Sequence, residues 1–147
     1  VRATIMQQSS LEIDVEDSAF LTFGIENKKN SHLVANLTMD FIRHDNQRNC
    51  IVIGESGTLK WDGIKQEVSI LRQGEISWTN LITTTHSSNA SYLAEWKDFL
   101  ECLDTRKSPM TTGRDGLKSL EVIEAALESA PTGKQIKIQR NSIEGDF

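Results

Sequence analysis

Hydrophobic and polar positions alternate through the first half of the chain, which is the pattern of half-buried β-strands. The clearest run lies between residues 32 and 41, where one face carries Leu33, Ala35, Leu37, Met39 and Phe41. The other face is mostly polar and carries His32, Asn36, Thr38 and Asp40, with Val34 as its one apolar residue. Such a long alternation predicts a strand with one buried side and one side that faces water, a ligand or a partner.

Shorter runs predict further strands before and after this one. They cover residues 4–6, 11–15, 19–23, 48–54, 58–61 and 64–71. Between the last two runs, Asp62-Gly63 predicts a type I′ hairpin, because both central residues of that turn need positive φ. The runs together predict a mostly antiparallel or mixed sheet of about six or more strands.

The second half of the chain has helical spacing instead. One apolar stripe predicts a helix that starts near a cap at 88–91 and closes at 106–109; it consists of Leu93, Trp96, Phe99, Leu100 and Leu103. Thr112 and Asp115 resemble a capping box, with Asp in place of the usual Glu or Gln. They predict a second helix that ends before Pro131.

Residues 135–139 can then return as a last strand. A sheet followed by helices predicts an α+β fold with the helices on one face.

Length and composition are those of one globular domain, which we expect to cover residues 1–140 and to be followed by a polar tail at 141–147. The net charge of −5 argues against nucleic acid as the main partner. No apolar run is long enough to span a membrane. Cys50 and Cys102 lack metal-like spacing, so we expect reduced thiols and a cytoplasmic protein. Because Val1 already begins a predicted strand and is not a methionine, we expect the chain to be a segment of a longer polypeptide.

No motif predicts catalysis or nucleotide binding by this chain alone. Gly54-x-x-Gly57 is followed by a strand, and Gly113-x-x-Gly116 lacks the later acidic residue of a dinucleotide site. The three histidines have no metal-binding spacing, and neither cysteine has a nearby histidine.

Two other groups of residues have a chemical and a plain structural interpretation. Arg43 and Arg48 flank a strand end and could hold a phosphate or carboxylate, although a charged hairpin end is the simpler explanation. The three tryptophans could stack on sugars, although core or interface positions are more common for this residue.

Four motifs, in order, make the chain resemble the closing segment of the Gfo/Idh/MocA oxidoreductases. The first is Val15-Glu-Asp-Ser-Ala19, similar to the family's entry to its substrate-domain sheet. The others are a hairpin at 54–62, Tyr92-x-x-Glu95-x-x-x-Phe99, and a final helix that begins at Gly113-x-Asp115-Gly116. The resemblance implies a fold like the C-terminal domain of glyceraldehyde-3-phosphate dehydrogenase. It also implies a parent NAD(P)-dependent oxidoreductase that acts on a sugar, polyol or sugar derivative.

The nicotinamide fingerprint and the catalytic residues of that family lie upstream of the matched region. We therefore expect no catalytic residue, no metal and no cofactor site in this fragment, which would be inactive alone. The candidate substrate-binding residues are Asn36, Thr38 and Asp40, on the polar face of the long strand, together with Arg43. The same face could instead join subunits of a homo-oligomer. The alternative function is a free-standing, non-enzymatic oligomerisation or ligand-binding module.

Overall fold

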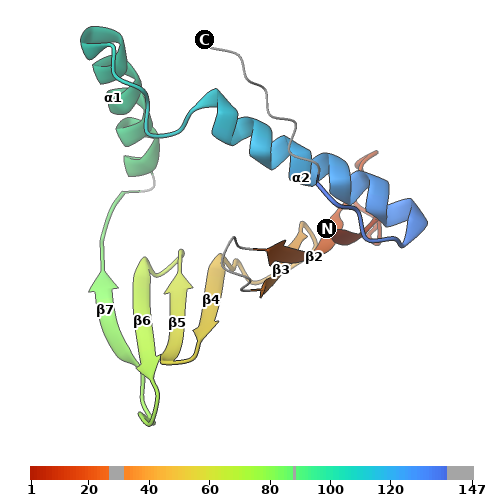
Figure 1. Cartoon of the computed structure of the whole chain (residues 1–147), viewed down its shortest axis with the longest axis horizontal. Coiled ribbons are helices and arrows are strands. Elements are labelled where there is room, and N and C mark those ends of the chain that lie inside the picture. The colour runs from red at the N-terminus through yellow and green to blue at the C-terminus, as the bar shows by residue number, and fades with distance from the viewer. Residues whose placement is uncertain (27–31, 88, 139–147) are drawn as a thin grey trace. The chain divides into compact units, whose positions relative to one another are not determined.

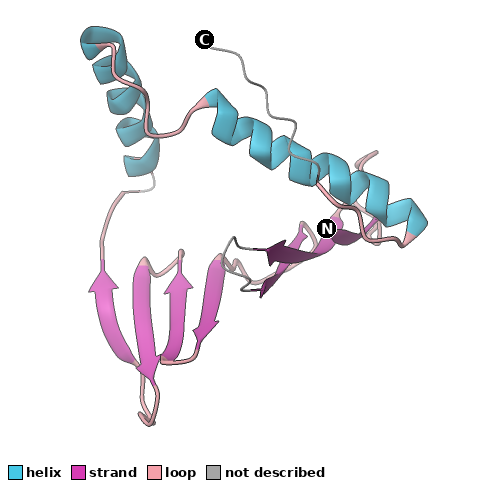
Figure 2. Ribbon diagram, in the orientation of Figure 1, coloured by secondary structure: helices cyan, strands magenta, loops and turns pink. Residues whose placement is uncertain are grey.

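The structure is a computed structural model, and it describes residues 1–26, 32–87 and 89–138. These residues contain seven strands and two helices (Figures 1 and 2). The chain forms two compact units, Val1–Arg43 with Thr111–Phe147 and, separately, His44–Met110. Each unit holds one antiparallel sheet. The predicted α+β class is confirmed, with the strands divided between these two sheets.

Three strands form the sheet of the first unit in the order β1 (Arg2–Met6), β2 (Ser18–Glu26) and β3 (His32–Asp40). The last of them is the strand that the long alternation predicts. In the register, Leu21 lies opposite both Ala3 and Leu37. Because successive side chains point to opposite faces of a sheet, the residues next to Leu21 in sequence lie on the other face. The sheet thus has an apolar face and a largely polar one.

Helix α2 (Gly113–Thr132) covers the apolar face, mainly over β1 (Figure 1). A small core forms where the two meet, and its buried apolar residues are Val1, Ala3, Leu21, Ala125 and Ala126. Ser129 of the helix is also fully buried. Its hydroxyl accepts a hydrogen bond from the Ala3 amide (3.0 Å) and donates one to the Lys134 carbonyl (2.6 Å). Helix, strand and following segment are therefore joined at one point.

The predicted capping box at the start of α2 is confirmed. The Thr112 hydroxyl accepts a bond from the Asp115 amide, and the Asp115 carboxylate accepts one from the Thr112 amide. The predicted end of the helix is wrong, because Pro131 lies inside the last turn. Pro131 donates no N–H to the helix. The Thr132 hydroxyl and the Gly133 amide donate to the carbonyls of Glu128 and Ser129, which closes the last turn.

The predicted strand at 11–15 is also wrong, because residues 7–17 form an irregular loop between β1 and β2. Asp17, which is 1% exposed, fixes this loop. Its carboxylate accepts bonds from the amides of Gln8 and Ser9 and from the hydroxyls of Ser9 and Ser18, all at 2.7–3.0 Å. Because the carboxylate accepts hydrogen bonds from four donors, it offers the loop backbone an alternative to pairing with a β-strand.

No strand forms over residues 134–138, contrary to prediction. Ile136 nevertheless exchanges two backbone hydrogen bonds with Val1, at 2.6 and 2.8 Å. Ile136 and Ile138 also pack against the core. Gln139, the predicted end of this strand, and the predicted tail at 141–147 lie outside the described residues.

The second unit contains a sheet in the order β4 (Asn49–Gly54), β5 (Gly57–Asp62), β6 (Glu67–Arg72) and β7 (Thr79–Thr83). The predictions for 48–54, 58–61 and 64–71 correspond to the first three, whereas β7 was missed. The predicted type I′ turn at Asp62-Gly63 is wrong. Residues 63–66 form a longer loop in which the Asp62 carboxylate accepts from the amides of Ile64 and Lys65, and the positive φ (57°) falls on Gln66.

Helix α1 (Ala90–Thr105) completes the second unit. Asn89 is its N-cap, within the predicted range, but no side chain caps it, and Ser88 lies outside the described residues. The helix ends at Thr105, and its C-cap Arg106 adopts the left-handed conformation (φ 56°). Its apolar stripe is exposed, since Leu93, Trp96 and Leu103 each keep more than 60% of their surface in solvent.

Candidate functional site

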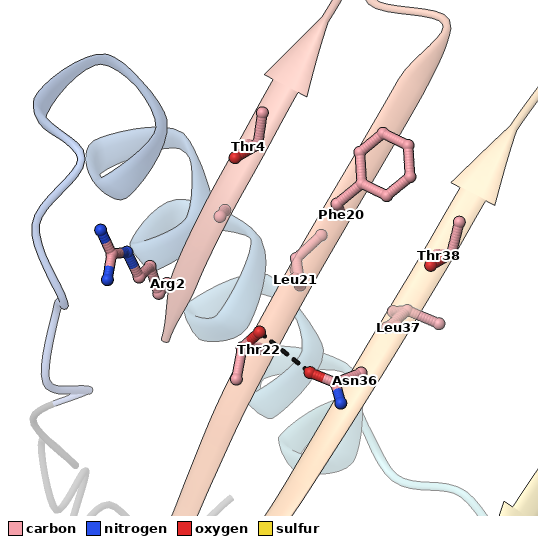
Figure 3. Close-up of a pocket in the computed structure, with 9 residues that line it drawn as sticks. Arg2, Thr4, Phe20, Leu21, Thr22, Asn36, Leu37 and Thr38 are labelled. Carbon is pink, nitrogen blue, oxygen red and sulfur yellow. Dashed lines mark hydrogen bonds between the residues drawn. The ribbon is translucent and has the colours of Figure 1, made fainter.

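The polar face of the first unit's sheet is the candidate site. It is the face opposite α2, which lies behind the strands in Figure 3. Two rows of side chains cross it. Strand register sets Phe20 between Thr4 and Thr38, and it sets Thr22 between Arg2 and Asn36. These six residues line an open hollow of about 380 Å³, together with Ala3, Leu21 and Leu37.

One hydrogen bond orders the polar row. The Thr22 hydroxyl donates to the Asn36 carbonyl oxygen at 3.0 Å (Figure 3). The amide nitrogen of Asn36 therefore remains a donor with no partner among the described residues. The hydroxyls of Thr4 and Thr38 likewise make no hydrogen bond within the described part of the chain. The hollow thus offers several groups that a polar ligand could use.

The hollow has one charged residue in its lining. Arg2 is the one charged side chain that lines the hollow, and it makes no ion pair with any residue that the structure describes. A guanidinium is planar and always protonated, so it can take a carboxylate or phosphate in a two-point contact.

The four candidate residues from the sequence divide into two pairs. Asn36 and Thr38 line the hollow, whereas Asp40 and Arg43 do not. The Asp40 carboxylate accepts a hydrogen bond from the Arg43 amide at 2.8 Å, which stabilises the turn after β3. Whether any of the four binds substrate stays a prediction.

Sequence reasoning missed the contributions of β1 and β2 to this face, namely Arg2, Thr4, Phe20 and Thr22. Their alternation was visible, but the pairing of β1 with β2 and of β2 with β3 was needed to align them with Asn36 and Thr38. Register is a tertiary property, so a single strand cannot reveal it.

A second open hollow of about 400 Å³ lies in the other unit. It is lined by Asn46, Gln47, Arg48, Asn49, Ile51, Lys60, Asp62, Ile64 and Lys65. Hydrogen bonds from two backbone amides stabilise the Asp62 carboxylate and lower its pKa; the bond from Lys65 has the larger effect and the bond from Ile64 the smaller one. The guanidinium of Arg48 lies 5.7 Å from the centre of the Trp61 ring. Because Arg43 and Arg48 fall in different units, the structure does not show them as one anion site.

The described residues contain no group of three or more His, Cys, Asp and Glu side chains that could hold a metal ion. The three tryptophans are 39–63% exposed, so none of them is a core residue in these units. Neither α1 nor α2 is long and apolar enough to cross a membrane.

Known proteins show which family this fold represents. Residues 1–138 match the Gfo/Idh/MocA sequence profile described as "Oxidoreductase family, C-terminal alpha/beta domain". No curated protein sequence is similar enough to count as a match.

Three solved structures illustrate the likeness in fold. An aldose–aldose oxidoreductase from Caulobacter crescentus, complexed with glycerol, has a TM-score of 0.64 and 23% identity over 92% of this chain and 40% of its own. A UDP-N-acetylglucosamine 3-dehydrogenase from Acidithiobacillus ferrooxidans has a TM-score of 0.62 and 18% identity, over 89% and 39%. A biliverdin reductase from Synechocystis, in complex with biliverdin and NADP+, has a TM-score of 0.65 and 15% identity, over 88% and 39%.

The chain thus spans about two fifths of the length of these relatives. At such identities the likeness shows a shared fold and nothing about substrate. The profile, by contrast, covers all of the described residues. The chain therefore belongs to the Gfo/Idh/MocA oxidoreductase family and corresponds to its C-terminal alpha/beta domain.

Proposed function

We propose that this chain is the substrate-binding part of an NAD(P)-dependent oxidoreductase that acts on a sugar, polyol or sugar derivative. The observation that carries the proposal is the hollow on the open sheet face, where Asn36 and Thr38 stand beside two more threonines. Hydroxyl and carboxamide groups are suited to a ligand with many hydroxyls, because each can both donate and accept hydrogen bonds. Asp40 and Arg43, just beyond the hollow, would contact a larger ligand.

The names of two structural relatives support a sugar-type substrate, since they describe an aldose oxidoreductase and a nucleotide-sugar dehydrogenase. The third acts on biliverdin, so the fold alone does not fix the substrate. Its bound NADP+ supports a nicotinamide cofactor for the parent enzyme. In this proposal the cofactor-binding and catalytic groups lie outside the 147 residues, and the chain supplies one wall of the substrate site.

The coding region upstream of Val1 tests this proposal. We expect it to encode a strand, a Gly-x-Gly-x-x-Gly turn and a helix, because that arrangement lets backbone amides hold a pyrophosphate. The isolated chain should then show no saturable binding of NAD(H) or NADP(H) by calorimetry. A start codon within a few residues of Val1, or micromolar nucleotide binding by the chain alone, would contradict it. Either result would favour the alternative, a free-standing non-enzymatic module.

A second candidate role for the same face is association between copies of the chain. The exposed Val34 and Phe20 on this face favour it, since 68% and 42% of their surfaces are in solvent. Light scattering coupled to size exclusion would show a dimer mass at high micromolar concentration if the sheet face joins two copies. A monomer mass throughout would contradict this role.

A further inference from the structure

Helix α2 is apolar on two of its sides. One side, which includes Val122, Ala125 and Ala126, lies on β1 and forms the small core of the first unit (Figure 1). A second apolar stripe follows a different side of the helix; it consists of Gly116, Leu120, Ile123, Leu127 and Ala130. Its three large residues keep 51–56% of their surface in solvent. Because a helix at a protein surface has a single apolar face, the second stripe indicates another layer that packs on α2.

The spacing of the second stripe indicates the nature of that layer. Its residues recur at intervals of four, three, four and three, which is the pattern of a helix that packs along another helix. In such a seam each large side chain inserts between residues of the facing helix. The pattern lasts for two heptads, which is too short for a free-standing coiled coil. It therefore indicates a helix–helix contact inside a larger folded protein.

An acidic row beside the second stripe indicates the charge of the facing helix. Glu121, Glu124 and Glu128 recur at intervals of three and four, and Glu124 directly flanks the stripe. None of the three forms an ion pair with another residue that the structure describes. Charges that flank a helical seam pair with opposite charges on the facing helix. The complementary partner is therefore a helix with an apolar seam and with lysine or arginine beside it.

Neither helix of the chain has this chemistry. Helix α1 carries a single basic residue, Lys97, and four acidic ones: Glu95, Asp98, Glu101 and Asp104. A second copy of α2 would bring one acidic row against another, which is unfavourable. Charge complementarity thus favours a helix from outside the 147 residues.

The connectivity of the chain favours a helix of the same polypeptide. The solved relatives are longer, since this chain spans about two fifths of their length. Val1 shares two backbone hydrogen bonds with Ile136, just past the end of α2. A polypeptide that enters β1 at Val1 therefore arrives beside α2, where a preceding helix can pack on it.

We propose that the second stripe of α2 packs on an amphipathic helix of the parent polypeptide that lies upstream of Val1. That helix presents an apolar seam to Leu120, Ile123 and Leu127, and it carries lysine or arginine beside the acidic row. Helix α2 is then the layer between the sheet and the upstream part of the protein. This inference rests on the proposed function, because that proposal takes the chain to be part of a longer enzyme.

Thiol labelling of the parent protein tests the inference. A cysteine is introduced as Ile123→Cys, and its reaction with N-ethylmaleimide is followed by peptide mass spectrometry, which separates it from other cysteines. The rate in the native parent is compared with the rate in urea. We expect at least about tenfold protection in the native parent, because a thiol in a packed seam reacts only when the contact opens locally.

Two matched cysteines on the same helix calibrate this rate. Lys118→Cys, at an exposed position outside the stripe and the acidic row, should show no protection in the parent. Ala126→Cys, in the buried core, should be protected both in the parent and in the 147-residue chain, which shows that both are folded. Ile123→Cys should be protected in the parent alone.

A charge reversal tests the predicted basic residues of the partner helix. Glu124→Lys brings like charges together, so the protection of Ile123→Cys in the parent should fall about threefold, which is the equivalent of one exposed ion pair. Glu101→Lys makes the same change at an exposed position of α1 and should leave this protection unchanged.

The inference is overturned if Ile123→Cys reacts equally fast in the native and the unfolded parent, or if Glu124→Lys does not reduce its protection. Protection of Ile123→Cys in the 147-residue chain would also overturn it. If that protection rises with the concentration of the chain, a second copy covers the stripe. In a parent that binds NAD(P)H, each of these results leaves the proposed function in place, since the upstream coding region and the NAD(P)(H) titration decide that function separately.

Discussion

Asp17 shows how much of the local structure depends on one charged residue. The Ser9 hydroxyl, then the amides of Gln8 and Ser9 and the Ser18 hydroxyl, stabilise the carboxylate against the opposing effect of burial. These donors hold the pKa of Asp17 well below its usual range. A carboxyl whose pKa is lower in the folded state than in the unfolded state stabilises the fold above the unfolded pKa, and this contribution is lost as the pH falls.

We therefore expect Asp17→Asn to lower the urea midpoint of unfolding at pH 7, and the deficit relative to wild type to shrink as the pH falls below about 4, the usual pKa of an aspartate. Circular dichroism at several pH values measures this. Asp14→Asn, in the same loop but at an exposed position, is the control and should have little effect. A deficit that stays constant down to pH 3 would mean that the carboxylate charge is not what matters.

Ser129 is the second residue with a disproportionate role. Its hydroxyl is fully buried and joins α2 to β1 and to Lys134. Ser129→Ala leaves the Ala3 amide and the Lys134 carbonyl without their partner, so we expect a loss of about 1–3 kcal/mol in the free energy of unfolding. Ser119→Ala, at an exposed position of the same helix, should be neutral or slightly stabilising. Equal effects of the two substitutions in urea denaturation would count against this role.

Among the elements, α1 and α2 differ in how they end. Gly133 terminates α2 in the left-handed conformation, whereas α1 ends with Arg106 in that conformation. A residue with a Cβ is strained there, and glycine is not.

Arg106→Gly should therefore stabilise α1 by roughly 1 kcal/mol. Slower amide hydrogen exchange along the helix would measure the gain. Lys107→Gly places the glycine one position later, where φ is not positive, and should give no gain. Faster exchange in Arg106→Gly would contradict the prediction. It would mean that the arginine side chain stabilises α1 by more than its left-handed backbone conformation destabilises it.

The sequence predicts elements well where the pattern is long and local. The alternation of residues 32–41 and the Thr112–Asp115 pair each correspond to a structural feature at the expected place. Prediction from the sequence fails where contacts with another part of the chain determine the local conformation. Residues 11–15 alternate like a strand, but they lie in a loop that Asp17 fixes through the amides of Gln8 and Ser9. Likewise Gln66, not Gly63, takes the positive φ. Four of the six polar-face residues that line the candidate hollow were missed for the same reason, since strand register brings β1 and β2 to it.

At the scale of the whole molecule, buried side chains are unevenly distributed. The buried core belongs to the first unit, and none of the described residues between 44 and 110 is buried. A four-stranded sheet and a helix without a buried core cannot offset the entropy lost on folding. We therefore expect the second unit to depend for its stability on the rest of the protein. The single domain predicted over residues 1–140 stays a prediction.

Leu21→Ala tests this dependence. Truncation of a buried leucine costs about 2–5 kcal/mol and acts directly on the first unit alone. All three tryptophans lie in the second unit, so their fluorescence reports on it, whereas far-ultraviolet circular dichroism reports on both. If the chain is one domain, both signals shift to the same lower urea midpoint. Two separate transitions would show that the units fold independently.

The pairing of Val1 with Ile136 has a consequence for the connectivity of the chain. The segment that enters β1 and the segment that leaves α2 run side by side and share two backbone hydrogen bonds. A domain whose first and last segments lie close together can be inserted into a loop of another protein, or can be circularly permuted. A few glycines between residue 138 and Val1, with new ends opened at the Glu55-Ser56 turn, would therefore alter the order of the elements without altering their neighbours.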